Sequence, residues 1–133
     1  MGRVLVVDDN RETAEAVRRL LKHSGHQAVA IDDGAKAIDW LAREPTQPDL
    51  ILLDWMMPNV GGADVLRAIR ADPLYANVRV VIFSASYEFE TVSEATRLGA
   101  DDYIAKGAIR WDAMVRKLEE HMGRGQGHGG APN

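Results

Sequence analysis

The strongest constraint on the fold of this chain is an alternation, repeated five times, of short apolar runs with longer amphipathic segments. Short runs rich in valine, isoleucine and leucine are typical of parallel strands that are buried on both faces of a sheet. A strict alternation of strands with helices predicts a parallel sheet with right-handed crossovers and helices on both faces. The expected strands are Arg3–Val7, Gln27–Ile31, Leu50–Leu53, Val78–Phe83 and Asp102–Ala105.

Each expected helix has an apolar stripe and is bounded by residues that begin or end helices. Asn10 and Asp33 can cap the first two helices, which end before Gly25 and Pro45 respectively. Five strand–helix units predict an α/β fold of the doubly wound type, in which function lies at the carboxyl ends of the strands. The other expected helices are Ala63–Ala71, Glu88–Leu98 and Trp111–Met122.

One domain accounts for nearly the whole chain. With 133 residues, of which 46% are hydrophobic and 27% charged, the chain can bury a core without disulfides. We assign residues 1–122 to this domain. Residues 123–133, with the sequence GRGQGHGGAPN, have no periodic apolar positions, so we expect them to form a disordered, glycine-rich tail.

Composition excludes several classes of protein. The chain has no cysteine, which rules out disulfide scaffolds, thiolate metal sites and cysteine nucleophiles. A net charge of −4 argues against a nucleic-acid partner, because such a partner requires a basic surface. No apolar run approaches the roughly 20 residues that span a bilayer, and the N-terminus does not read as a secretory signal. We therefore expect a cytoplasmic domain that binds neither nucleic acid nor membrane.

Polar side chains gather where the expected strands end. Asp8 and Asp9 follow the first strand, and Asp54, Ser84 and Lys106 follow the third, fourth and fifth strands. The carboxyl ends of parallel strands lie along one edge of a sheet, so these side chains should converge on one pocket. Any one of them alone is more often a helix cap, a turn residue or a surface charge. Their joint placement at consecutive strand ends predicts a functional site.

The chemistry of this pocket follows from its charges. Three crowded carboxylates repel one another and raise one another's pKa values. A hard divalent cation relieves the repulsion, and Mg²⁺ is suitable because it accepts a few carboxylates together with waters and phosphate oxygens. Lys106 would add a positive charge and Ser84 a hydrogen-bond donor, so the pocket should hold a tetrahedral anion. Asp54 is the natural nucleophile, because carboxylates form aspartyl phosphates.

These residues also resemble, in their order and spacing, the receiver domain of two-component response regulators. The resemblance covers residues 3 to about 122 and is closest to the stand-alone, chemotaxis-Y-like, single-domain regulators. It implies a flavodoxin-like (βα)5 fold with strand order 2-1-3-4-5. The motifs that carry it are Val4–Asn10 (VLVVDDN), Asp54–Pro58 (DWMMP) with Gly62, Ser84–Ala85 and Gly99–Lys106 (GADDYIAK).

The resemblance implies a role for each matching residue. Asp54 would be the phosphoacceptor, and Lys106 would contact a phosphoryl oxygen. After phosphorylation Ser84 would move to bond another phosphoryl oxygen, and Tyr103 would rotate inward with it as the switch residue. The implied Mg²⁺ ligands are Asp9, Asp54 and the backbone carbonyl of Met56, with Asp8 acting through a water molecule.

The chain departs from the family pattern at a few positions. Gly107 follows Lys106, where the family usually has proline. A cis bond to a residue other than proline costs about 2.5–4 kcal/mol, so this loop either bears that strain or follows a different path, and Lys106 would be held less rigidly. Gly61 stands where an acidic residue is common, and the Gly61–Gly62 pair should loosen the loop that enters the third helix. Ser84 in place of threonine keeps the hydroxyl.

The resemblance implies partners as well. A histidine kinase or a histidine phosphotransfer protein would supply the phosphoryl group. A downstream protein would bind the face formed by the fourth helix, the fifth strand and the fifth helix. Such a domain assists its own phosphorylation and dephosphorylation but is not a turnover enzyme.

Other functions remain to be weighed against this one. The main alternative is a receiver-like module that binds proteins without being phosphorylated, for which Gly107 is the argument. An aspartate-nucleophile phosphatase would have an acid/base aspartate where this chain has Met56. A nucleotide-binding domain would require a glycine-rich phosphate loop after the first strand, where the chain has Asp8 and Asp9.

Overall fold

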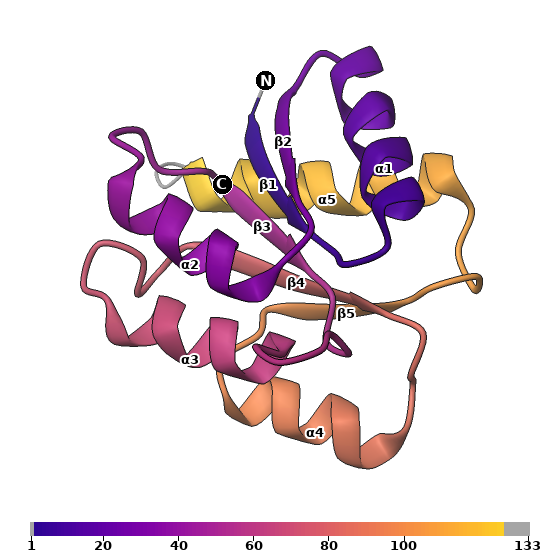
Figure 1. Cartoon of the computed structure of the whole chain (residues 1–133). Coiled ribbons are helices and arrows are strands. Elements are labelled where there is room, and N and C mark those ends of the chain that lie inside the picture. Colours follow the sequence, from indigo (N-terminus) through magenta and orange to yellow (C-terminus); the bar gives the residue numbers. More distant parts are fainter. Residues whose placement is uncertain (1, 127–133) are drawn as a thin grey trace.

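The computed structural model of the chain describes residues 2–126 and consists of a parallel five-stranded sheet flanked by helices (Figure 1). The strand order is β2-β1-β3-β4-β5, as the resemblance to receiver domains implies. The strands are β1 (Arg3–Val7), β2 (Gln27–Ile31), β3 (Leu50–Leu53), β4 (Arg79–Ser84) and β5 (Asp102–Ala105). The helices are α1 (Arg11–His23), α2 (Gly34–Arg43), α3 (Gly62–Ala71), α4 (Phe89–Arg97) and α5 (Trp111–Gln126).

The predicted boundaries of α3 and α4 differ from the observed ones by one residue, and two further boundaries were wrong. Strand β4 lies one residue later than expected, so that Ser84 is its last residue and not the residue after it. Helix α5 continues to Gln126, so residues 123–126 are helical and do not belong to a disordered tail. Extending an existing helix adds one hydrogen bond per residue, which offsets the low helix propensity of glycine. The rest of the expected tail, residues 127–133, lies outside the described residues.

The helix starts follow the predicted capping. The side chain of Asn10 accepts a hydrogen bond from the backbone N–H of Thr13 at 3.0 Å, and Asp33 accepts one from Lys36 at 3.0 Å. Gly25, just after α1, has a φ of 94°, the left-handed conformation that glycine adopts readily.

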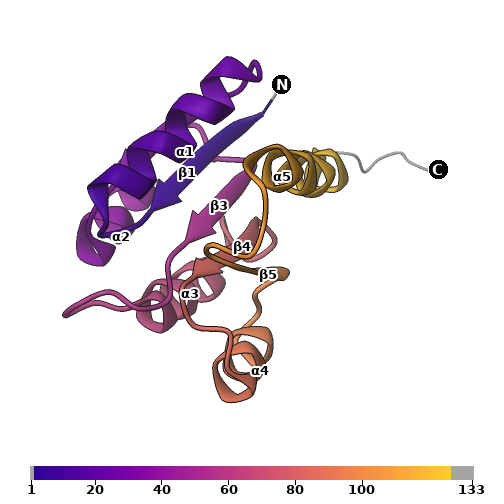
Figure 2. The same ribbon diagram turned by 90° about the vertical axis from the view of Figure 1, so that its right-hand side faces the viewer.

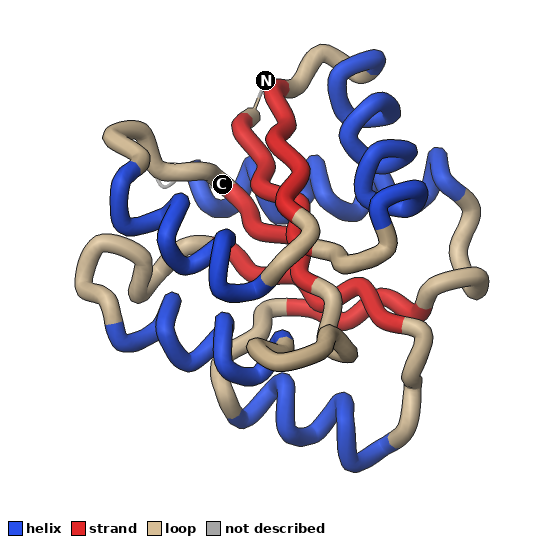
Figure 3. The backbone as a smooth tube through the Cα atoms, in the orientation of Figure 1, coloured by secondary structure: helices blue, strands red, loops and turns tan. Residues whose placement is uncertain are grey.

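The core has two parts, one on each face of the sheet. Helices α1 and α5 cover one face, and α2, α3 and α4 cover the other (Figures 2 and 3). Successive side chains of a strand point to opposite faces, so Val4 and Val6 of β1 belong to the first part and Leu5 and Val7 to the second. The expectation that all strands are buried on both faces was wrong for β2, because this strand forms an edge of the sheet and is only half-buried.

None of the helices within residues 2–126 combines the length and the apolar character that crossing a bilayer requires.

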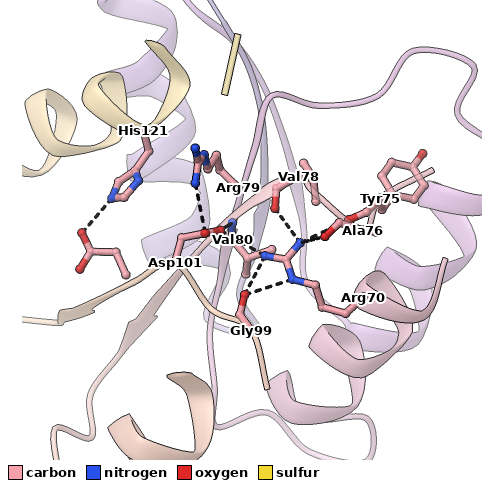
Figure 4. Close-up of polar contacts among 10 residues, drawn as sticks. Arg70, Tyr75, Ala76, Val78, Arg79, Val80, Gly99, Asp101 and His121 are labelled. Atoms are coloured by element: carbon pink, nitrogen blue, oxygen red, sulfur yellow. Dashed lines mark hydrogen bonds and ion pairs between the residues drawn. The ribbon is translucent and has the colours of Figure 1, made fainter. Parts of the chain in front are cut away.

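Arg70, near the end of α3, ties together three segments at the edge where the strands begin (Figure 4). Its guanidinium donates to the carbonyl of Gly99 at 2.7 and 3.0 Å and to the carbonyl of Val78 at 2.7 Å. It also pairs with Asp101 at 3.1 Å, and Asp101 in turn pairs with Arg79 at 3.3 Å. One largely buried side chain thus connects α3, the loop before β4 and the turn before β5. His121 lies beyond this network, 2.9 Å from Asp102.

We expect Arg70→Met to destabilise the fold by about 2–4 kcal/mol, because the substitution leaves several carbonyls without their charged donor. The matched control is Arg67→Met on the same helix, where 54% of the arginine side chain is exposed and its guanidinium lies 3.5 Å from Asp64. That variant should change stability by no more than about 0.5 kcal/mol. Urea unfolding of both variants measures the difference, and equal effects would contradict the structural role of Arg70.

Candidate functional site

The register of β1 and β3 brings the predicted acidic residues together. Val7 pairs with Leu53 at the ends of these strands, so Asp8 and Asp54 follow side by side, and the N–H of Asp54 donates to the carbonyl of Val7 at 2.8 Å. The carboxylate oxygens of Asp8, Asp9 and Asp54 lie within 4.8 Å of one another. Asp8 and Asp54 are buried, whereas Asp9 is exposed. Within the described part of the chain, no other group of three acidic or histidine side chains is close enough to hold a metal ion.

Lys106 joins these carboxylates from the end of β5. Its Nζ lies 2.8 Å from Oδ2 of Asp8 and 3.6 Å from Oδ2 of Asp54. Its backbone N–H donates to the carbonyl of Ser84 at 2.8 Å, which fixes the start of the following loop against β4. The ammonium also lies 5.6 Å from the centre of the Phe83 ring, a contact favourable for a cation. The predicted positive charge is therefore in place.

The loop after Lys106 follows a path that proline could not follow. No peptide bond among the described residues is cis, and Gly107 has a φ of 81°. Proline is confined to a φ near −65°, so glycine suits this left-handed position. Of the two paths that the sequence leaves open, the chain takes the one without a cis bond. The altered path still leaves Lys106 in contact with Asp8.

The electrostatics of the pocket centre on Asp54. Burial, followed by the neighbouring charge of Asp8, raises the pKa of Asp54 to about 7, against the lowering effect of Lys106. The contribution of Asp8 is the repulsion expected from crowded carboxylates, and it is smaller than that of burial. A donor set made of carboxylate oxygens matches hard divalent cations such as Mg²⁺, so these residues fit the ion that the sequence predicts.

Met56 lies beside Asp54 at the rim of the pocket. Its backbone N–H faces Oδ1 of Asp54 at 3.4 Å, and 64% of its side chain is exposed. The exposed side chain leaves the backbone of Met56 as the part next to the pocket, which agrees with the predicted role of its carbonyl as a metal ligand.

The two predicted switch residues lie next to the loop that connects β4 with α4. Ser84 is fully buried, and its hydroxyl accepts a hydrogen bond from the N–H of Ser86 at 3.3 Å. Tyr103 is half-buried, and its hydroxyl donates to the carbonyl of Ser86 at 2.5 Å. The ring of Tyr87 packs edge-on against that of Tyr103, with centroids 5.7 Å apart. Both switch residues are thus linked through Ser86.

Sequence reasoning missed two aromatic neighbours of the site. Phe83, beside Lys106, was read only as part of a strand, and Tyr87, beside Tyr103, was not singled out. Phe83 also packs edge-on against Trp111 at the start of α5, with centroids 6.4 Å apart. Phe83 and Tyr87 lie one and three positions from Ser84 in the sequence. Their closeness to a predicted site residue is the signal that could have identified them.

Gly62 allows the start of α3 to pack directly against the chain at Asp54. A Cβ atom at Gly62 would lie 2.5 Å from the carbonyl oxygen of Asp54 and 2.6 Å from Cα of Trp55. A Cβ atom at Gly61 would meet nothing closer than 3.6 Å. The two glycines therefore differ in role, because only Gly62 is required for close packing.

The strand order and the acidic pocket define a flavodoxin-like α/β domain of the receiver type. The sequence profile of the response regulator receiver domain matches residues 4–119, so the chain belongs to this family.

Two curated relatives show how the chain compares with longer family members. The DNA-binding response regulator MtrA of Mycobacterium tuberculosis is 39% identical over 104 residues, which cover 78% of this chain and 43% of MtrA. The cell cycle transcriptional regulator CtrA of Caulobacter vibrioides is 33% identical over 126 residues, which cover 95% of this chain and 52% of CtrA. The chain thus spans about half the length of the curated relatives it matches.

Solved structures of the family superpose closely. The receiver domain of the Francisella response regulator 1452 has a TM-score of 0.82 at 27% identity, over 93% of this chain and 98% of that domain. The phosphorylated cyanobacterial phytochrome response regulator RcpA has a TM-score of 0.80 at 25% identity, over 99% of each chain. The Mn²⁺-bound form of response regulator Rcp1 has a TM-score of 0.79 at 25% identity, over the full length of both chains.

The two glycines at the start of α3 provide a matched pair of variants. Gly62→Ala should destabilise the protein by about 1–3 kcal/mol, because its methyl group would overlap backbone atoms that cannot move aside. Gly61→Ala should be close to neutral, since its methyl group would have room. Thermal or urea unfolding distinguishes the two. Equal stability of both variants would show that α3 does not depend on this close approach.

The raised pKa of Asp54 predicts a dependence of stability on pH. Because the folded carboxyl holds its proton up to a pH of about 7, whereas the unfolded one releases it near 4, stability falls as the pH rises through this interval. Without divalent ions, Asp54→Asn should therefore be more stable than the wild type at pH 8, by at least ~2 °C in melting temperature, with a smaller difference at pH 5.

The same comparison includes a test of the metal. Mg²⁺ at pH 8 should raise the melting temperature of the wild type more than that of Asp54→Asn, because the ion stabilises the folded state that binds it. A wild type more stable than Asp54→Asn at pH 8 in a chelator would show that the carboxylate repulsion is relieved without an ion.

Proposed function

We propose that this receiver domain is a phosphorylation switch in a two-component phosphorelay and that Asp54 is its phosphoacceptor. The observation that carries the proposal is the pocket itself. The buried carboxylate of Asp54 lies within 4.8 Å of the carboxylates of Asp8 and Asp9 and 3.6 Å from the ammonium of Lys106. Such an arrangement brings a nucleophile together with groups that can neutralise a phosphoryl group.

The chain's own residues account for the transfer from a phosphohistidine donor. A carboxylate oxygen of Asp54 attacks phosphorus, so that an O–P bond forms as the P–N bond breaks. The electron pair of the broken bond stays on the imidazole nitrogen, which takes up a proton. Lys106 neutralises charge on the transferred phosphoryl oxygens. Asp9, Asp54 and the backbone carbonyl of Met56 would hold Mg²⁺ directly and Asp8 through a water molecule, and the ion would supply further positive charge to the site.

The hydrogen bonds of Ser86 support a role for Ser84 and Tyr103 as the switch. Ser84 now accepts a hydrogen bond from the N–H of Ser86, and Tyr103 donates to the carbonyl of the same residue. A phosphoryl oxygen on Asp54 would offer the Ser84 hydroxyl a charged acceptor, which is stronger than a neutral one. Movement of Ser84 would then release Ser86 and, with it, the hydroxyl of Tyr103.

This movement would be read by a partner protein on the face formed by α4, β5 and α5. Tyr87 and Phe89, at the start of this region, have exposed fractions of 66% and 82%. Exposed aromatic side chains are typical of surfaces that bind proteins. A histidine kinase or a histidine phosphotransfer protein would supply the phosphoryl group. MtrA is named as DNA-binding, but the net charge of −4 here supports a protein as the direct partner.

We further propose that the domain works in the cytoplasm and is not a turnover enzyme. In the transfer reaction the phosphoryl group stays on the domain's own Asp54. Each copy therefore accepts one phosphoryl group and can accept another only after it is dephosphorylated.

The proposal is tested by intact-mass measurement after incubation with acetyl phosphate or phosphoramidate. We expect a single phosphoryl adduct on the wild type with Mg²⁺, none in a chelator and none on Asp54→Asn. Asp39→Asn, a control at an exposed aspartate of α2, should be modified like the wild type. A folded wild-type protein that stays unmodified with Mg²⁺ would favour the alternative, a module that binds proteins without phosphorylation.

A further inference from the structure

Strand β2 is an edge of the sheet that lacks the usual protection against pairing. Its five residues, Gln27–Ile31, include no charged residue and no proline, and Val29 is 38% exposed. Exposed edges are normally blocked by charges, proline, bulges or a covering segment. The opposite edge, β5, begins with Asp102, whose carboxylate is held by His121 at 2.9 Å. Only one of the two sheet edges is therefore open to pairing.

The backbone groups at this edge can be identified from the ladder with β1. The N–H of Gln27 donates to the carbonyl of Gly2 at 2.9 Å, and the carbonyl of Ile31 accepts from the N–H of Asp8 at 3.1 Å. In a parallel ladder, alternate residues direct their N–H and C=O groups to opposite sides. The backbone groups of Ala28 and Ala30 therefore face away from β1, toward the open edge.

A groove runs along the carboxyl half of this edge. It has a volume of about 630 Å³ and lies between α1 and α2, with Ala30 and Ile31 of β2 at its floor. Trp40 contributes an apolar wall from α2. The charged residues at the end of the groove pair with one another, since Asp32 lies 2.6 Å from Arg11 and 3.9 Å from Lys36. The groove therefore has room for an uncharged extended strand and no unpaired charge at that end to repel one.

We propose that two copies of this chain associate through their β2 edges, in antiparallel pairing about a two-fold axis at Val29. This register places Ala28 of one copy opposite Ala30 of the other, in both directions. Their outward N–H and C=O groups then form the closely spaced hydrogen-bonded pairs of an antiparallel ladder. The two sheets then join into one.

The charges on the flanking helices favour a second copy over another strand. On α1, Glu15 lies 3.4 Å from Arg19, and on α2, Asp39 lies 3.3 Å from Arg43, so on each helix a carboxylate precedes an arginine by one turn. Helices from two copies run in opposite directions across the axis. The order of carboxylate and arginine is therefore opposite on the two copies, which is the self-complementary charge pattern of an isologous contact.

Sedimentation of the unphosphorylated protein in a chelator tests the proposal, independently of the proposed phosphorylation. We expect a dimer to form as the concentration rises from about 10 μM to 1 mM, the range of weak self-association. Ala30→Pro removes an outward N–H that the ladder with β1 does not use, and Val29→Lys adds a charge to the edge. Either variant should raise the dimer dissociation constant about ten-fold or more.

Two controls make the result specific. Leu74→Lys changes a side chain that is 67% exposed at a site away from β2, and it should associate like the wild type. Asp39→Arg should weaken association, and the swap Asp39→Arg with Arg43→Asp should restore it, since the pattern is then merely reversed. Circular dichroism shows whether each variant is folded. If Ala30→Pro does not fold, Val29→Lys alone decides the test.

Three outcomes would overturn the proposal. The wild type could remain monomeric throughout the concentration range. A dimer could persist in both edge variants, which would place the interface elsewhere. A dimer could be lost equally in Leu74→Lys, which would indicate association through general hydrophobic contact.

Discussion

The crowding of three carboxylates at one end of the sheet is the interaction on which the rest of the site depends. Asp8 and Asp54 are buried there side by side, and two buried carboxylates repel each other unless a positive charge compensates or one of them is protonated. Lys106 supplies part of that charge, 2.8 Å from Asp8, and a hard cation would supply more. Burial, and after it the charge of Asp8, still raises the pKa of Asp54 against the effect of Lys106. The excess of negative charge makes the pocket suitable for a divalent cation.

The carboxyl edge of the sheet, where the carboxylates lie, differs from the opposite edge in how its segments are connected. At the carboxyl edge of the sheet, hydrogen bonds of Ser86 link Ser84 and Tyr103 to the loop after β4. At the opposite edge, Arg70 fastens three segments through several carbonyls and an ion pair with Asp101. A frame held firmly at one end can tolerate movement at the other, which is what a conformational switch requires.

Much of the fold and most of the site could be predicted from the sequence, because the signals are local. Strand–helix alternation predicted the sheet, and Asn10 and Asp33 predicted helix starts. The errors occurred where a neighbour decides the outcome. Helix α5 runs four residues past its apolar stripe, since an existing helix can extend through poor helix formers. Strand β2 is half-buried because nothing pairs with its outer side, which its own residues do not reveal.

By itself, the sequence determined that this protein is a five-unit α/β domain with Asp8, Asp9, Asp54, Ser84 and Lys106 at strand ends, because residue periodicity and strand boundaries are properties of short segments. Only the tertiary structure decided how these side chains meet: that Lys106 contacts Asp8 despite Gly107, that Gly62 must lack a side chain, and that Tyr103 shares Ser86 with Ser84. Such contacts join residues far apart in the chain, and their distances follow from the packing of whole elements, which no local pattern encodes.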